Sequence, residues 1–248
     1  MTERIIDTFT PNEGKAEIAV LMPVYNEAKT IEKTVMEFYT TISPRMPVEL
    51  VISEDGSRDK TKEVIERLSK KIPLKAILST NRKGYAGGIK DGLKIVDAEY
   101  VLITDSDGQL DPNGFWKLWN LRTKYDIISG WRRRRADALY RRVMSKTFQF
   151  IVKSAFGFSN LMDITAPFKL MRTEIAKEIA HECKYMKESF WTEFIVRAYK
   201  KGFSIIEVPV VHRNRADKSA TRVYEPWKIP KIVFNQLVAL IKLRLELS

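Results

Sequence analysis

The run Ile18-Ala19-Val20-Leu21-Met22-Pro23 is continuously apolar, which predicts a strand buried on both faces. From this run onward, the chain alternates between apolar runs typical of strands and amphipathic stretches typical of helices. Further strands are predicted at 48–53, 74–79, 100–104, 126–129, 168–171 and 204–208. Helices are predicted at 29–42, 59–71, 85–96, 113–124, 173–181 and 189–201. This alternation predicts an α/β fold with a mostly parallel central sheet flanked by helices, and a ligand crevice at the carboxyl ends of the strands.

The composition allows one sizeable core and indicates an anionic partner. With 248 residues, 44% of them hydrophobic, we expect a single domain. The formal charge of +12 suits nucleic acid, anionic lipid or a phosphorylated substrate. One cysteine and two histidines leave no internal disulfide and no zinc cluster of these residues, which favours a reducing compartment. The N-terminus lacks the apolar core of a signal peptide, and no apolar run reaches the ~20 residues that span a bilayer, so we expect a soluble or peripheral protein.

The motif Thr104-Asp105-Ser106-Asp107-Gly108-Gln109 directly follows a predicted buried strand. Two carboxylates and a side-chain amide at this spacing provide the hard oxygen ligands that Mg²⁺ and Mn²⁺ prefer. A bound diphosphate would complete the coordination. The alternative is an ordinary turn, because Asp, Ser and Gly all favour turns.

Two earlier strands also end in polar loops, at Pro23–Glu27 and Glu54–Asp59. In a doubly wound sheet these loops converge on one crevice with the Asp-x-Asp motif. Ser57 or Asp59 also suits a helix cap, and the two roles are compatible. Asp55 is the better candidate for a contact with a base or ribose.

These motifs, together with Asn81–Gly88, resemble the successive landmarks of the family 2 inverting glycosyltransferases with the GT-A fold. Within that family they resemble the polyprenyl-phosphate sugar synthases of the dolichyl-phosphate mannose synthase type. That group also has an Arg-rich segment after the fifth strand and an Asp-x-Thr stretch that leads into Phe-Lys or Phe-Arg. Here this stretch is Asp163–Lys169, and the resemblance extends over residues 17–225.

The resemblance implies a donor site and a metal site in residues 17–130. The residues implied in nucleotide-sugar binding are Pro23, Tyr25, Glu27, Asp55, Lys83, Gly84, Asp105 and Ser106. The residues implied around a Mg²⁺ or Mn²⁺ ion are Asp105, Asp107 and Gln109. Two departures from the family pattern, Glu54 and Ala166-Pro167, are expected to bear on base preference and on the sugar pocket.

Residues 131–225 are expected to bind the acceptor. Trp131–Lys146 contains seven basic residues and one acid, interleaved with apolar side chains, which suits a lipid interface, a solvated helix face or a nucleic-acid patch. The resemblance favours an acceptor phosphate, and Arg213–Ser219 is similar to a basic loop of that group. The phosphate-binding residues that it implies are Arg132, Arg141, Ser145, Arg215 and Lys218.

The last segment, 226–248, is apolar with interspersed charges, and is predicted to form amphipathic helices at an interface or against the sheet. Members of this group often continue into transmembrane helices, so a transmembrane region or a membrane-anchored subunit is a candidate partner of this segment. We therefore expect a peripheral protein at the cytoplasmic face of a membrane.

The predicted reaction is direct, inverting displacement of a nucleoside diphosphate from a hexose, of the GDP-mannose or UDP-glucose type, by polyprenyl or dolichyl phosphate. Asp105, Asp107 and Arg132 are its predicted catalytic residues. A phosphate acceptor is already ionised and needs no general base. Transfer to a sugar hydroxyl, in polysaccharide or glycolipid synthesis, is the first alternative and would need Asp163 or Glu193 as base. A nucleotidyltransferase and a basic nucleic-acid-binding module are two further hypotheses, although our leading prediction has no nucleic-acid partner.

Overall fold

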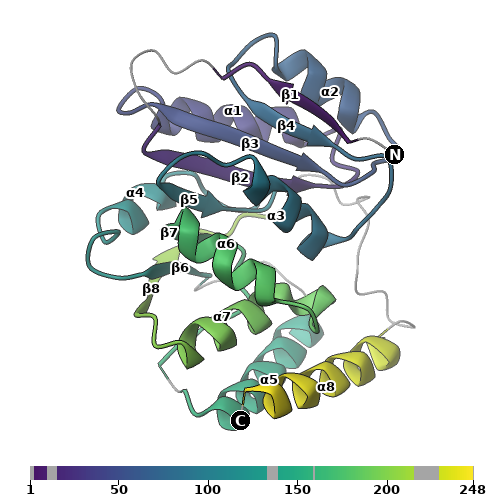
Figure 1. Cartoon of the computed structure of the whole chain (residues 1–248), viewed down its shortest axis with the longest axis vertical. Coiled ribbons are helices and arrows are strands. Elements are labelled where there is room, and N and C mark those ends of the chain that lie inside the picture. The colour runs from purple at the N-terminus through teal and green to yellow at the C-terminus, as the bar shows by residue number, and fades with distance from the viewer. Residues whose placement is uncertain (1–2, 10–15, 133–138, 159, 215–228, 248) are drawn as a thin grey trace.

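The protein is built on one sheet of eight strands (Figure 1). The computed structural model describes residues 3–9, 16–132, 139–158, 160–214 and 229–247. The strand order is β1-β4-β3-β2-β5-β7-β6-β8. The strands are β1 (Arg4–Asp7), β2 (Ile18–Val24), β3 (Val48–Glu54), β4 (Lys75–Leu78), β5 (Tyr100–Ile103), β6 (Ile127–Arg132), β7 (Lys169–Arg172) and β8 (Ile205–Val210).

The centre of the sheet is parallel, as the alternation of strands and helices predicts. β2 pairs in parallel with β3 on one side, Ile18 opposite Val48, and with β5 on the other, Ile18 opposite Tyr100. Every residue of β2 and β3 is buried. The carboxyl ends of β2, β3, β4 and β5 therefore open at the same edge of the sheet, which is where the polar loops begin.

Helices cover both faces of the sheet (Figure 1). The helices are α1 (Ile31–Ile42), α2 (Thr61–Leu68), α3 (Tyr85–Lys94), α4 (Gly114–Trp119), α5 (Leu139–Phe156), α6 (Thr173–Glu182), α7 (Phe190–Lys200) and α8 (Ile229–Glu246), with a 3-10 turn η1 (Lys187–Ser189) before α7. One core joins α1, α2 and α4 to the sheet, and a second joins α3, α6 and α7 to its other face. This confirms the predicted α/β fold with a mostly parallel sheet.

Several elements differ from the sequence predictions, and α5 lies where no helix was predicted. β1 was not predicted, because it is a four-residue antiparallel edge strand in which Ile5 is exposed and only Ile6 packs on the core. β7 lies antiparallel between β5 and β6, so the parallel order is interrupted there. α4 ends at Trp119, short of the predicted 113–124, and residues 120–124 form turns instead of α-helix.

α5 and α8 pack against each other at the end of the molecule remote from β1 (Figure 1). The segment that we predicted as amphipathic helices is the single helix α8 where it is described. No helix in the described ranges is both long enough and apolar enough to cross a membrane.

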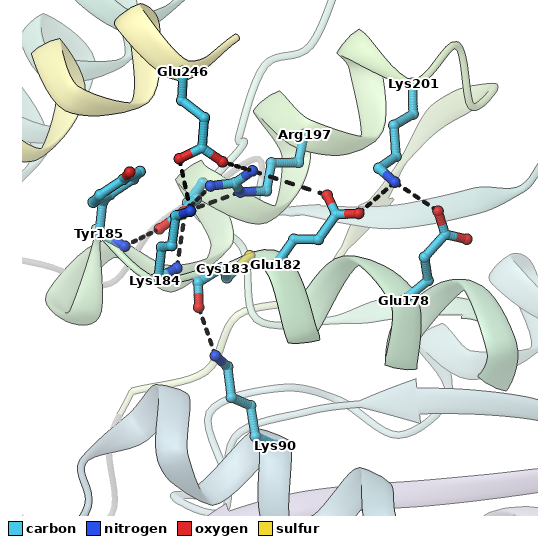
Figure 2. Close-up of polar contacts among 10 residues, drawn as sticks. Lys90, Glu178, Glu182, Cys183, Lys184, Tyr185, Arg197, Lys201 and Glu246 are labelled. Atoms are coloured by element: carbon cyan, nitrogen blue, oxygen red, sulfur yellow. Dashed lines mark hydrogen bonds and ion pairs between the residues drawn. The ribbon is translucent and has the colours of Figure 1, made fainter.

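An ion cluster fastens α8 to α6 and α7 (Figure 2). Glu193 accepts hydrogen bonds from the backbone N–H groups of residues 184–186 at 2.8–3.0 Å. Arg197 donates to Glu193 at 2.9 and 3.0 Å and to Glu246 of α8 at 3.0 Å. The Glu193 and Arg197 side chains are only 1% and 3% exposed. Their attraction therefore compensates for the hydration that each charge loses on folding.

Candidate active site

The loops after β2 and β3 are bonded directly to each other. The backbone N–H of Asn26 donates to the Ser57 hydroxyl at 2.9 Å, and the N–H of Arg58 donates to the Asn26 side-chain oxygen at 2.8 Å. Asn26 adopts a left-handed backbone with φ of 54°, a conformation that Asn tolerates better than most residues. The predicted convergence of strand ends is therefore present in the structure.

Asp55 holds the loop after β4 in place. Its two carboxylate oxygens accept the backbone N–H groups of Lys83 at 2.6 Å and of Gly84 at 2.8 Å. Burial raises the pKa of Asp55, although these two hydrogen bonds oppose the rise. Gly84 has a φ of +84° and directly precedes α3, so this bond also fixes the start of that helix. In this structure Asp55 therefore joins the end of β3 to the loop after β4.

Two more of the acids in these loops have local partners. Glu27 is buried and accepts the Thr30 hydroxyl at 2.6 Å, at the start of α1. Glu54, the departure from the family pattern, is fully buried, accepts the Ser57 N–H and lies 3.6 Å from the Lys62 ammonium. Both carboxylates therefore shape the loop backbones.

The remaining predicted nucleotide residues lie on the loops at the same edge of the sheet. The Arg82 guanidinium stacks over the Tyr25 ring at 4.0 Å. The Ser106 hydroxyl donates to the carbonyl of Pro23 at 3.1 Å, which joins the loop after β5 to the end of β2. The Lys83 ammonium pairs with Glu3 and with Asp91 of α3. The structure thus brings the predicted donor residues together at one edge of the sheet.

Asp105 is contacted by a residue that our sequence analysis did not single out. The Tyr85 hydroxyl donates to Asp105 at 2.9 Å, and the Trp191 indole N–H donates to the Tyr85 oxygen at 2.9 Å. Burial raises the pKa of Tyr85 well above its usual value, and the Asp105 charge acts in the same direction. Tyr85 therefore stays protonated and remains a hydrogen-bond donor at neutral pH.

The loop after β5 supplies some, but not all, of the oxygen ligands that a divalent cation needs. Asp105 and Asp107 lie on this one loop, and their carboxylates are hard oxygen ligands. Asp107 also accepts the Gln109 N–H at 3.1 Å, while the Gln109 side-chain amide donates to the carbonyl of Arg213 at 3.2 Å. No group of three metal-ligating side chains occurs among the residues that the structure describes. Two carboxylates suit a cation whose other ligands come from a bound diphosphate.

Arg132, at the end of β6, is held in a buried ion pair. Its guanidinium donates to both oxygens of Asp163 at 2.8 and 2.9 Å and to the Thr165 hydroxyl at 3.1 Å. Ser145 lies on α5 and accepts a hydrogen bond from Gln149 at 3.2 Å. Arg215 and Lys218 lie outside the described residues, as does the side chain of Arg141. Of the predicted phosphate-binding residues, the structure therefore places only Arg132 and Ser145.

Lys169 is a second residue that we did not predict for the site. Its side chain is fully buried, and its ammonium donates to the Ser129 hydroxyl at 2.9 Å and to the carbonyl of Ala166 at 2.6 Å. The same ammonium lies 5.1 Å from the centre of the Trp191 ring. Burial lowers the pKa of Lys169 to about 7, although the charge of Asp163 opposes this shift.

The lowered pKa of Lys169 predicts a stability that rises with pH. The unfolded lysine titrates near 10.5 and the folded one near 7, so between these values the unfolded chain binds more protons and the free energy of unfolding increases with pH. Below both pKa values, Lys169 is protonated in both states, so its contribution to the free energy of unfolding no longer changes with pH. Urea unfolding of the wild type and of Lys169→Met between about pH 7 and pH 9.5 should give a wild-type curve that is steeper by about 1.4 kcal/mol per pH unit at most. Lys177→Met, at an exposed lysine, is the control. Parallel curves for wild type and Lys169→Met would contradict the lowered pKa.

Comparison with known proteins decides the family. Residues 19–180, well over half of the chain, match the family described as "Glycosyl transferase family 2". The chain belongs to this family. The match confirms the family and the enzyme class that the sequence motifs predict.

Curated relatives of this family 2 transferase include two that share most of its length. It is 30% identical to "Glycosyltransferase AglD" of Haloferax volcanii over 212 residues, which cover 81% of this chain and 34% of that relative. It is 24% identical over 229 residues to "Undecaprenyl-phosphate 4-deoxy-4-formamido-L-arabinose transferase" of Pectobacterium carotovorum, covering 90% of this chain and 67% of that relative. The chain thus spans only about a third of the Haloferax protein.

Solved structures show the same fold at low sequence identity. The mannosyltransferase PcManGT of Pyrobaculum calidifontis, solved with GDP-Man and Mn²⁺, superposes with a TM-score of 0.63 at 18% identity, covering 93% of this chain and 65% of that one. Glucosyl-3-phosphoglycerate synthase of Mycobacterium tuberculosis, solved with Mn²⁺, UDP-glucose and phosphoglyceric acid, gives 0.64 at 16% identity over 92% of this chain and 80% of that one. These likenesses confirm the GT-A architecture.

Proposed function

We propose that this transferase moves a hexose from a nucleotide sugar to a polyprenyl phosphate, with inversion and with a divalent metal, at a membrane surface. The observation that carries the donor half is the convergence of four strand-end loops, two of them bearing Asp55 and the pair Asp105 and Asp107, in a family 2 fold. The relative named as acting on undecaprenyl phosphate supports the acceptor half.

The state of the two candidate bases supports a phosphate acceptor. A sugar hydroxyl needs a carboxylate to take its proton, whereas a phosphate monoester is already ionised near pH 7. Asp163 is 3% exposed and is bonded by both oxygens to Arg132. Glu193 is 1% exposed and is held by Arg197 and three backbone N–H groups. Both carboxylates therefore already have buried structural partners, which supports a structural role for them over the role of a general base.

The metal would be held by Asp105 and Asp107, with Gln109 on the same loop, and would be either Mg²⁺ or Mn²⁺. When bound, it supplies positive charge to the departing diphosphate. Asp55 would fix the loop at Lys83 and Gly84 against the nucleotide, and Tyr25, stacked under Arg82, would line the same crevice. This crevice is expected to accept a GDP or a UDP donor, and both belong in the test.

The acceptor phosphate would be met by the cationic side of the crevice. Arg132 is aligned by Asp163 and Thr165, so it would enter the reaction already oriented. The charge of Arg132 is already balanced by Asp163. We therefore assign the larger part of phosphate binding to Arg141, Arg215 and Lys218, with Ser145 as a hydroxyl donor. Arg forks bind phosphate bidentately.

The exposed faces of α5 and α8 suit an anionic lipid surface. Large apolar side chains on these helices are open to solvent: Phe150 and Ile151 on α5, and Val233, Phe234, Leu237, Ile241 and Leu245 on α8. Exposed basic residues are interspersed on the same helices: Lys146, Lys231, Lys242 and Arg244. Apolar residues that enter the interface and cations that meet lipid phosphates characterise peripheral helices of this kind. We assign this surface to the cytoplasmic face of the membrane.

Replacing two of these apolar residues should release the protein from vesicles. Phe234 and Ile241 are 67% and 60% exposed, and burying each in lipid contributes roughly 1.5–3 kcal/mol. Phe234→Ser with Ile241→Ser should therefore weaken binding to vesicles containing anionic lipid by about 100-fold or more, measured by co-sedimentation. Ile5→Ser, at an equally exposed residue on β1, is the control and should bind as the wild type does. Equal binding by the double variant would exclude α8 from the contact.

The proposed function is tested by incubating the protein with Mn²⁺ or Mg²⁺, a polyprenyl phosphate in detergent and radiolabelled GDP-mannose or UDP-glucose in turn. A labelled lipid that forms with at least one donor is the expected result. Donor binding without any labelled lipid would overturn the acceptor assignment and leave transfer to a sugar hydroxyl. Retention on DNA without donor binding or hydrolysis would instead favour a nucleic-acid-binding module.

A further inference from the structure

A row of three side chains connects the core of the second half of the chain to the proposed metal site. Trp191, in the first turn of α7, donates its indole N–H to the Tyr85 oxygen at 2.9 Å. Tyr85, the first residue of α3, donates its hydroxyl to Asp105 Oδ1 at 2.9 Å. Trp191 and Tyr85 are 106 residues apart in the sequence, so the contact depends on the tertiary fold.

The direction of each hydrogen bond in this row is fixed by chemistry. An indole nitrogen can only donate, so the Tyr85 oxygen must accept from Trp191. The Tyr85 proton is then directed to the carboxylate of Asp105. Because Asp105 is a carboxylate, this bond is charge-assisted and stronger than one between neutral groups.

The outer end of the row is itself held rigidly. Trp191 is 4% exposed and packs against Phe190 and Phe194, with ring centres 5.2 and 5.3 Å apart. The buried Lys169 ammonium lies over the indole, 5.1 Å from the ring centre. The indole therefore has little freedom to turn away from Tyr85.

The geometry points to Tyr85 and Trp191 as positioning residues for Asp105, which set the orientation in which this carboxylate meets the metal and the donor diphosphate. The inference rests on the proposed function. A metal-binding carboxylate commonly depends on a hydrogen-bonded partner for its orientation, and loss of such a partner typically weakens metal binding. Neither residue needs to touch the substrate in this role.

The direct test is the binding of Mn²⁺ in the presence of GDP or UDP, followed by the electron paramagnetic resonance signal of the free ion. Tyr85→Phe keeps the ring and removes the hydroxyl, and should weaken Mn²⁺ binding by about 10- to 100-fold. Trp191→Phe should weaken it less, because Tyr85 remains, and Trp191→His, which restores an N–H donor, should recover part of the loss. Tyr199→Phe is the control, since that hydroxyl donates to the Gly157 carbonyl away from the loop.

Activity provides a second readout that a loss of fold would not mimic. In Tyr85→Phe the Mn²⁺ concentration for half-maximal rate should rise while kcat at saturating Mn²⁺ stays within a few-fold of wild type. A lower kcat at every Mn²⁺ concentration, or Mn²⁺ binding equal to wild type in both Tyr85→Phe and Trp191→Phe, would overturn the inference. If the wild type itself binds no Mn²⁺ with either nucleotide, the proposed function fails, and this outcome is distinct from failure of the positioning role.

Discussion

Asp107→Ala is expected to lower kcat by about 10²- to 10³-fold, because it removes one of the two carboxylates proposed to hold the metal at the departing diphosphate. Asp107 lies on a loop and accepts the N–H of Gln109 within that same loop. The rate is measured with saturating donor and acceptor. Treatment of the wild type with a chelator should give a similar loss of rate. Added Mn²⁺ or Mg²⁺ should restore the rate of the chelated wild type but not raise the rate of Asp107→Ala.

The matched control for this variant is Asp126→Ala. Asp126 precedes β6 and accepts hydrogen bonds from Ser204. Its replacement by Ala is the same substitution, made at a residue that we do not assign to the metal. It should retain nearly full activity. Full activity of Asp107→Ala, or a rate that is insensitive to the chelator, would contradict a metal at this loop.

Arg197→Met should lower the free energy of unfolding by about 3–5 kcal/mol, because it leaves the Glu193 carboxylate buried without its cation. It also breaks the bond to Glu246 and so loosens α8 from α7 (Figure 2). The free energy of unfolding of a domain is about 5–15 kcal/mol in total, so the loss expected for Arg197→Met is a large fraction of it. Urea unfolding followed by circular dichroism measures it.

Arg172→Met is the control for the buried pair. Arg172 pairs with Glu99 on the surface, where both side chains are about half exposed, and such pairs contribute roughly 0–1 kcal/mol. The double variant Glu193→Met with Arg197→Met should recover part of the loss, since no charge is then left unpaired. An Arg197→Met effect as small as that of Arg172→Met would show that Glu193 is solvated in solution.

The strands of this fold could be predicted because buried parallel strands have continuous apolar runs. β2 and β3 are buried at every position and were predicted to within a residue or two, whereas β1 has exposed residues and no such run. The convergence of the loops at Asn26, Asp55 and Asp105 also followed from the sequence, because parallel strands end at the same edge.

The contacts between distant segments could not be predicted in this way. No local pattern joins Tyr85 to Trp191 or Arg132 to Asp163, because these pairs form only when α3, α7 and β6 have packed on the sheet. The spacing of Glu193 and Arg197 at i and i+4 is a visible signal for an ion pair, but burial of the pair is not readable from spacing. Burial also supports a structural role for Glu193 over the role of a base.

The most direct test of the proposed phosphate acceptor is a competition between two acceptors that differ only in the reacting group. Polyprenyl phosphate and the matching polyprenol are mixed in equal amounts in one detergent micelle, with Mn²⁺ and the radiolabelled donor, and the labelled lipids are separated. We expect label in the phosphate lipid alone, as an inverted glycosyl phosphate, because both candidate bases for a hydroxyl, Asp163 and Glu193, are held in buried ion pairs. Label in the polyprenol, or none in the phosphate lipid, would contradict the phosphate acceptor.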